Sequence, residues 1–258
     1  MRSFKAYFKK EILESVRTNK YLILFVGIVF WALLDPLMLK LLPLLLKNYL
    51  PADLTVLFST FNRDSAFQTF LKDLFQIGTI FISLTLMGLI ASEVSLKKLV
   101  FPYSRGANPA GIVLAKYIHY MVTISLSILI AFLTNYFYIN RLFTGGILSI
   151  EIVLKSSLLY ILYYSVLLSI LLYLSSLFKR GLIAGITVLV LVYTLSIFNL
   201  FEAIRAYFPN YLLFKAADIG HIFDNSLIPT VIVSFCIIIL LIFFSILRMK
   251  KIDVAWRS

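Results

Sequence analysis

The sequence predicts an all-α integral membrane protein with six transmembrane helices. Of its 258 residues, 61% are hydrophobic, and the mean hydropathy is +0.98. The apolar residues are gathered into blocks about 20 residues or more in length, which is the length that a helix needs to cross a bilayer. Basic residues stand at the ends of these blocks, as is typical of membrane proteins. We therefore treat the chain as one transmembrane domain, residues 1–258.

The composition excludes several other classes. The net charge of +12 comes from cations at the ends of apolar blocks, where they report membrane orientation, so we expect membrane lipid as a partner and no nucleic acid. A single cysteine, Cys236, allows no disulfide framework within the chain.

Residues 1–20 form a basic segment that precedes the first apolar block. Apolar side chains at helical spacing alternate with cations; they are Phe4, Tyr7, Phe8, Ile12 and Val16. This pattern predicts an amphipathic helix at the cytoplasmic interface. Glu11 falls close to the apolar side, which fits only if the carboxylate meets a partner. The alternative is that the segment is simply a positive flank that orients the first span.

The first span is predicted over residues 21–46, with an interruption at Asp35-Pro36. Proline removes a backbone hydrogen bond, and a carboxylate inside the membrane is costly unless it is paired or hydrated. Two interpretations are open: the span ends near Asp35, or Asp35 lines a polar cavity on a translocation path.

Three further spans are predicted over residues 73–92, 112–138 and 152–178. Hydroxyl groups recur on one face of the third and of the fourth span. These side chains are candidates for a translocation path: Tyr120, Thr123, Ser127, Ser165, Ser169 and Tyr173. The alternative is that they hold neighbouring helices together by hydrogen bonds.

The last two spans are predicted over residues 181–200 and 228–247. The fifth opens with Gly181 and Gly185, a G-x-x-x-G pattern that lets another helix approach closely. Between the two spans, short apolar pieces such as 211–217 cannot cross the bilayer, and we expect re-entrant or interfacial helices there.

The distribution of cations orients the chain. Six spans put both termini on one side, and that side carries 16 of the 24 Lys and Arg residues against 6 on the other. The positive-inside rule then places both termini, and residues 93–116 between the second and third spans, in the cytoplasm of a multi-pass cell-membrane protein.

Residues 93–116 also carry a family resemblance. Glu93, the run Phe101-Pro102-Tyr103-Ser104-Arg105 and Leu114-Ala115-Lys116 follow the order found in the cytoplasmic loop of ABC transporter type-2 permeases, which this chain resembles. Ser95-Leu96 replaces the Gly-Thr that commonly follows the acidic residue. The resemblance implies that residues 93–116 are a coupling loop on which a separate ATPase subunit docks. The residues expected to contact the ATPase are Glu93, Lys97, Lys98, Leu99, Phe101, Pro102, Tyr103 and Arg105.

The resemblance implies more about assembly. Such permeases work as dimers through their first and fifth spans, so Gly181 and Gly185 become candidates for packing against a second copy or a homologous permease. It also implies that the N-terminal helix flanks the ATPase.

The chain lacks catalytic parts of its own. Gly106 and Gly111 have the spacing of a Walker A motif, but Ile112-Val113 stand where Lys and Ser/Thr are required. No zinc-enzyme or nucleophile motif appears in the sequence, and we expect neither a metal site nor an enzyme. ATP and magnesium are expected on the partner ATPase.

The sequence thus predicts the permease subunit of an ATP-driven ABC exporter. Two alternatives stay open. One is an ATP-independent channel or secondary carrier that uses Asp35, Lys116 or His119 as intramembrane ionisable groups. The other is a non-transporting structural subunit of a larger membrane complex.

Overall fold

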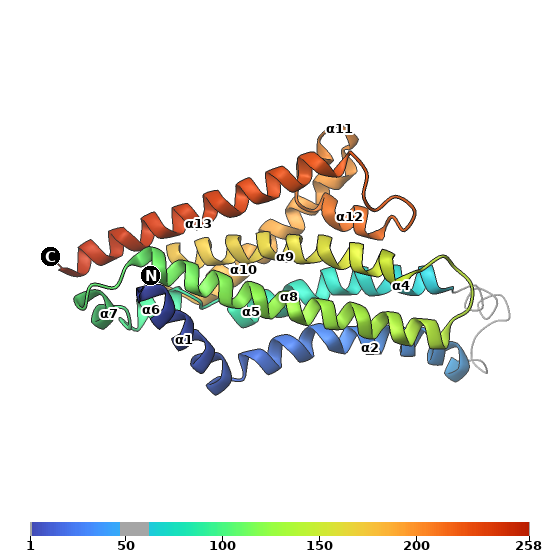
Figure 1. The fold of residues 1–258 in the computed structure, drawn as a ribbon, viewed down its shortest axis with the longest axis horizontal. Coiled ribbons are helices and arrows are strands. Elements are labelled where there is room, and N and C mark those ends of the chain that lie inside the picture. The colour runs from blue at the N-terminus through green and yellow to red at the C-terminus, as the bar shows by residue number, and fades with distance from the viewer. Residues whose placement is uncertain (1, 47–61, 258) are drawn as a thin grey trace.

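The computed structural model describes residues 2–46 and 62–257, and within these ranges the chain is helical without strands. The helices run lengthwise beside one another (Figure 1). The start of α1, the end of α13 and α7 lie at one end of the bundle, and the N-terminus of α4 lies at the other. The helices are α1 (Arg2–Arg17), α2 (Lys20–Leu46), α4 (Arg63–Asp73), η1 (Leu74–Gly78), α5 (Thr79–Leu86), α6 (Ala91–Ser95), α7 (Val100–Ser104), α8 (Pro109–Leu142), α9 (Ile150–Leu177), α10 (Gly181–Ser196), η2 (Ile197–Leu200), α11 (Glu202–Arg205), α12 (Tyr211–Ala217) and α13 (Leu227–Arg257).

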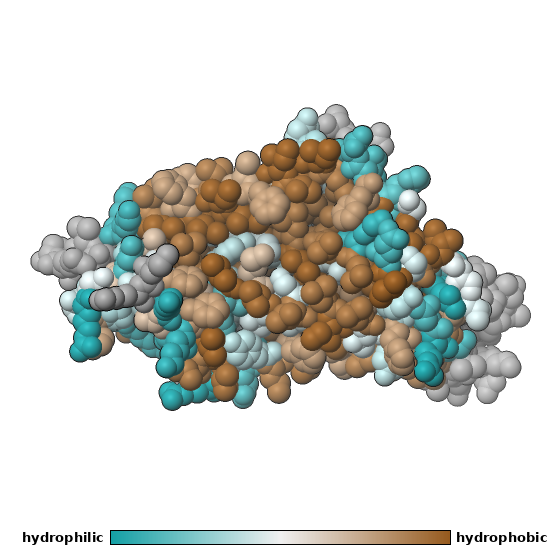
Figure 2. Space-filling view, viewed as in Figure 1, coloured by the Kyte–Doolittle hydropathy of each residue, from teal (hydrophilic) through white to brown (hydrophobic). Residues whose placement is uncertain are grey.

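Five helical stretches among the described residues are long and apolar enough to cross a membrane. They are Lys20–Leu41, Arg63–Ser95, Pro109–Leu142, Ile150–Leu177 and Leu227–Ile252. Apolar side chains cover the middle of the molecule and hydrophilic ones gather towards both ends (Figure 2), as in a protein with an apolar belt. The predicted helical class is therefore confirmed, with five candidate spans instead of six by length and composition.

The helix that contains the second predicted span is longer than that span, and α10 with η2 covers the fifth predicted span, 181–200. The second span was expected to begin near residue 73, but the helix begins at Arg63, where the Asn62 side chain caps it in a reciprocal pair of hydrogen bonds with Ser65. The fifth predicted span is α10, which has 16 residues and continues as the 3₁₀ turn η2. The expected short helices before the last span are present as α11 and α12.

Helix α2 continues through Asp35-Pro36 to Leu46, so the helix is not broken at the proline. Pro36 has no N–H, which leaves the carbonyl of Ala32 without its helical donor. The side-chain amide of Asn135 on α8 donates to that carbonyl at 3.2 Å. A neighbouring helix thus satisfies the backbone group that the proline frees.

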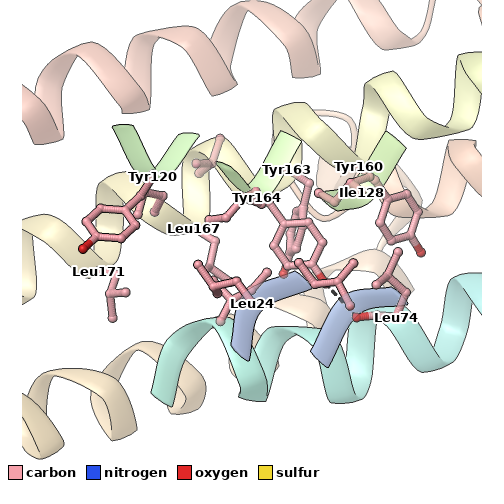
Figure 3. Close-up of a cluster of buried hydrophobic side chains, with 14 of the residues drawn as sticks. Leu24, Leu74, Tyr120, Ile128, Tyr160, Tyr163, Tyr164, Leu167 and Leu171 are labelled. Carbon is pink, nitrogen blue, oxygen red and sulfur yellow. Dashed lines mark hydrogen bonds between the residues drawn. The ribbon is translucent and has the colours of Figure 1, made fainter. Parts of the chain in front are cut away.

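Helix α9 packs against α8, α10, α12 and α13, and its tyrosines stabilise an irregular backbone. Between α4 and α5 the chain forms the π-helix η1. Tyr160 donates to the carbonyl of Leu71 and Tyr164 to that of Leu74, both at 2.7 Å. Figure 3 shows these two tyrosines among the leucines of the core. Inside an apolar bundle, such donors satisfy carbonyls that an irregular helix turn leaves exposed.

The glycine pair of α10 is used within the chain. A Cβ at Gly181 would lie 2.9 Å from the Cα of Gly88, and one at Gly185 would lie 2.8 Å from the Cβ of Met87. The G-x-x-x-G face therefore packs α10 against the segment after α5. This corrects the expectation that Gly181 and Gly185 pack against a second copy, because that face is already occupied.

Candidate functional site

The end of the bundle that holds α1 and α7 contains a buried charged cluster. Its first component is one face of α1, on which Tyr7, Glu11 and Ser15 recur every fourth residue and are all buried. This face packs against α8. Glu11, which the sequence places beside the apolar side of α1, is therefore turned into the protein.

Helix α8 supplies the opposite charge. Lys116 is 2% exposed and donates to Glu11 at 2.7 Å and to Glu93 of α6 at 3.0 Å. One ammonium group thus joins α8 to two carboxylates that come from α1 and α6. A buried lysine needs such partners, because an unpaired charge in an apolar interior is very costly.

Lys10 and Lys20 complete the cluster. Lys10 pairs with Glu93, with Glu11 at 3.0 Å and with Glu14 at 2.9 Å, and Lys20 pairs with Glu14 at 3.2 Å. Three lysines therefore face three glutamates, which makes the cluster neutral as a whole. Oxygen atoms of Glu11, Glu14 and Glu93 lie within 4.8 Å of one another, but the lysine ammonium groups already stand against them, so the arrangement is an ion-pair network.

Electrostatics keep the glutamates of α1 ionised. Burial would raise the pKa of Glu11, but Lys116 and Lys10 more than offset that effect and lower the pKa. Burial likewise opposes ionisation of Glu14, yet its hydrogen bond to Lys10 and the nearby cations lower its pKa to about 2. The carboxylates in turn raise the pKa of Lys10 against the effect of burial.

Polar side chains of α8 surround the ion pairs. The Tyr120 hydroxyl donates to Glu11 and accepts from Lys20, both at 3.3 Å. Ser15 Oγ lies 3.0 Å from His119 Nε2. Tyr120, a candidate for a translocation path, is instead part of this cluster.

Residues 91–108 form the loop that Glu93 ties to the cluster. After α6 the backbone turns at Lys97, which has a left-handed φ of 53°, and then forms the short helix α7. Pro102 lies within α7 and its carbonyl accepts from the amide N–H of Ala107. The side chain of Ser3 on α1 accepts from the amide N–H of Asn108, just before α8. Two separate contacts therefore join the loop to α1.

The loop has an inner and an outer side. Leu99 is 0% exposed, Tyr103 is buried, and α7 packs against α13. This corrects the expectation that Leu99, Tyr103 and Glu93 contact the ATPase. Leu99 and Tyr103 anchor the loop to the bundle, and Glu93 is buried in the charged cluster. Phe101, in contrast, is 62% exposed, and the Arg105 guanidinium lies 4.2 Å from its ring centroid. We define the docking face, a candidate contact surface, as the exposed apolar and basic side chains of the loop, Leu96, Lys97, Lys98, Val100, Phe101 and Arg105.

The residues proposed to line a translocation path do not converge on one cavity. Thr123 and Ser127 line a groove of about 790 Å³ between α1, α2 and α8. Ser165 lines a different groove between α8, α9 and α13, and Tyr173 a third. Ser169 is buried and donates to a carbonyl of its own helix. Within the described part of the chain these hydroxyls stand at separate places.

One feature of the charged cluster and one of the bundle are not apparent from local sequence patterns. Lys116 and Glu11 are 105 residues apart, and the one local signal for their pairing is the acid on the apolar side of α1. Asn135 gives no local signal at all, although Pro36 indicates that some donor is needed near Ala32.

Comparison of the chain with family models, with curated proteins and with solved structures finds no match. The class that the fold supports is a helical protein with several helices able to span a membrane.

Proposed function

We propose that this chain is the permease subunit of an ATP-driven ABC exporter, coupled to a separate cytoplasmic ATPase through the docking face. The observation that carries the proposal is the position of Phe101 and its neighbours. They expose apolar and basic side chains outside the apolar belt, at the end where both α1 begins and α13 ends. Exposed apolar residues that are rimmed by charge commonly mark protein contact sites.

The charged cluster gives the docking face a mechanical connection to the spans. A movement imposed on α7 reaches α13 by direct packing, and it reaches α1 and α8 through Glu93, Lys10 and Lys116. Because breaking a buried ion pair is costly, these segments are expected to move together. Closure of two ATPases would then tilt the attached spans.

Three partners follow from this function: an ATPase, a second permease and membrane lipid. ATP and magnesium bind the partner ATPase, the chain contributes no catalytic residue, and a second permease copy or a homologue completes the path. Cations of α1 such as Lys5 and Lys9 are exposed, which suits contact with anionic lipid headgroups at the cytoplasmic face.

The test is co-purification of the detergent-solubilised protein with its ATPase, comparing the native chain with the double variant Phe101→Ala, Arg105→Glu. We expect a Walker A protein with ATPase activity to co-purify with the native chain and to be lost from the variant. Both substituted side chains are exposed, so the variant should keep the native melting temperature.

The chain offers a matched control at the other end of α8. Phe137 is also exposed, and the guanidinium of Arg141 lies 5.1 Å from its ring centroid. The variant Phe137→Ala, Arg141→Glu removes an equivalent pair and should keep the ATPase. If the loop variant is folded and retains the ATPase fully, or if no ATPase accompanies the native chain, the coupling assignment fails.

A secondary carrier is the second candidate, because Asp35 is buried within α2 at 5% exposure. Intramembrane carboxyl groups often mark ion or proton pathways. Transport by reconstituted protein without any ATPase, driven by a proton gradient, would favour this function over the exporter.

A further inference from the structure

A buried acidic residue that does not belong to the charged cluster lies where α2 meets the end of α4. Asp35 is almost fully buried, and its Oδ2 atom has no hydrogen-bond partner among the described residues. The side chain of Asp73 lies within hydrogen-bonding reach of Asp35. Asp73 is half-buried and immediately precedes the π-helix η1, a kind of irregularity that recurs at functional sites.

Few charged groups of the described residues act on this pair. Asp73 acts on Asp35, and the exposed Lys72 acts on Asp73. Neither η1 nor α5 contains an ionisable residue. In the part of the chain that the structure describes, no lysine or arginine forms an ion pair with Asp35.

Near Asp35, helix α8 contributes a polar side chain, and no charged group of α8 acts on Asp35. The amide of Asn135 is fully buried and points at the carbonyl of Ala32, one turn before Asp35 on α2. Its Oδ1 atom has no hydrogen-bond partner among the described residues. Asp35 and Asn135 therefore each leave a buried oxygen without a partner, and the indole N–H of Trp31, one turn before Asp35 on α2, is a buried donor without one. A proton on Asp35 would supply a donor between the two carboxyl groups.

We propose that Asp35 and Asp73 form a proton-binding site between α2 and α4, in which Asp35 carries the proton and its carboxyl O–H donates a hydrogen bond to the carboxylate of Asp73. Two adjacent carboxyl groups cannot both ionise inside an apolar bundle. Asp35 keeps the proton because it is the more buried of the two, and Asp73 is the acceptor because Lys72 stabilises its negative charge. Separation of α2 from α4 would hydrate the pair and release the proton, so any movement of these helices becomes linked to pH.

The test is infrared spectroscopy of the full chain in lipid nanodiscs. At neutral pH we expect the carbonyl band of a protonated carboxylic acid, absent from Asp35→Asn and shifted in Asp73→Asn, which lacks the charged acceptor. The melting temperature of the native chain should fall as the pH rises from about 4, the ordinary aspartate pKa, through the pH at which Asp35 loses its proton, and should then level off. It should stay level in Asp35→Asn, since the amide imitates the protonated acid without titrating.

Two controls separate this site from the rest of the molecule. Glu11→Gln removes a buried carboxylate that is paired with Lys116 and should leave the band unchanged. The variant Phe101→Ala, Arg105→Glu should also leave it unchanged, so this proposal stands or falls independently of ATPase docking.

Three results would overturn the proposal. One is a native chain without the acid band, and another is a band that persists in Asp35→Asn. The third is an ionised pair at neutral pH whose melting temperature rises with sodium chloride but not with choline chloride, which would assign the site to a metal cation.

Discussion

The charged cluster and the Asp35–Asp73 pair both place carboxyl groups in the bundle, but the nearest charged neighbours of these groups have opposite signs. Glu11 and Glu93 share the ammonium group of Lys116, whereas Asp35 has another acid as its charged neighbour. The interior tolerates an ionised carboxylate where a cation accompanies it, and otherwise favours the protonated acid. Burial alone therefore does not determine the charge of these groups, and their neighbours do.

The largest effect is expected from removing the shared cation. Lys116→Met leaves Glu11 and Glu93 buried with less compensation, and breaking a buried pair in this way costs about 3–5 kcal/mol. Denaturant unfolding in detergent measures the loss. Lys155→Met is the control, because Lys155 pairs with Glu151 at the surface and its replacement should change stability very little. Equal stability of Lys116→Met and the native chain would contradict the importance of the cluster.

The next effect concerns the backbone beside the acid pair. Asn135→Leu leaves the Ala32 carbonyl unsatisfied, which costs about 1–3 kcal/mol. Pro36→Ala restores an N–H that can donate to that carbonyl, so the loss caused by Asn135→Leu should be smaller in the Pro36→Ala background. A double-mutant cycle in detergent measures this coupling. Equal losses in both backgrounds would show that Asn135 acts elsewhere.

The two regions should respond to pH with opposite signs. Glu14 has a pKa of about 2 in the folded chain, below the ordinary glutamate value, so its contribution is complete above about pH 4.5 and is lost as the pH falls towards 2. Glu11, whose pKa is also lowered, acts in the same direction. Melting temperatures measured across this acid range should fall less steeply for Glu14→Gln than for the native chain. A native chain that gains stability on acidification below pH 4 would contradict the sign.

The smallest effect is expected from Asp35→Asn at neutral pH. The amide retains a donor for Asp73 and has nearly the same volume as the acid, so stability should change by about 1 kcal/mol or less. The same unfolding assay compares it with Glu11→Gln, which leaves Lys116 with one of its two carboxylates and should be the more destabilising substitution. The reverse order would mean that Asp35 is ionised.

Much of the architecture follows from local patterns. Long apolar blocks predict helices over 112–138 and 152–178, which correspond to α8 and α9. The helix of the second predicted span begins at Arg63 instead of near residue 73, because Asn62 and Ser65 form a capping box before the apolar block. Pro36 predicts a break that does not occur, because a side chain from α8 replaces the missing donor.

The sequence by itself determined the helical class, the apolar blocks and the clustering of cations at one end, since each depends on composition and on the 3.6-residue period of a helix. Only the tertiary structure decided which polar groups meet. Periodicity shows that Glu11 lies near a buried face, but it cannot show that Lys116 of α8 forms an ion pair with it. Likewise it cannot show that Leu99 points inward while Phe101 points outward, or that Gly181 packs against Gly88 of the same chain. These contacts join segments that are far apart in the chain, and a local pattern carries no information about its distant partner.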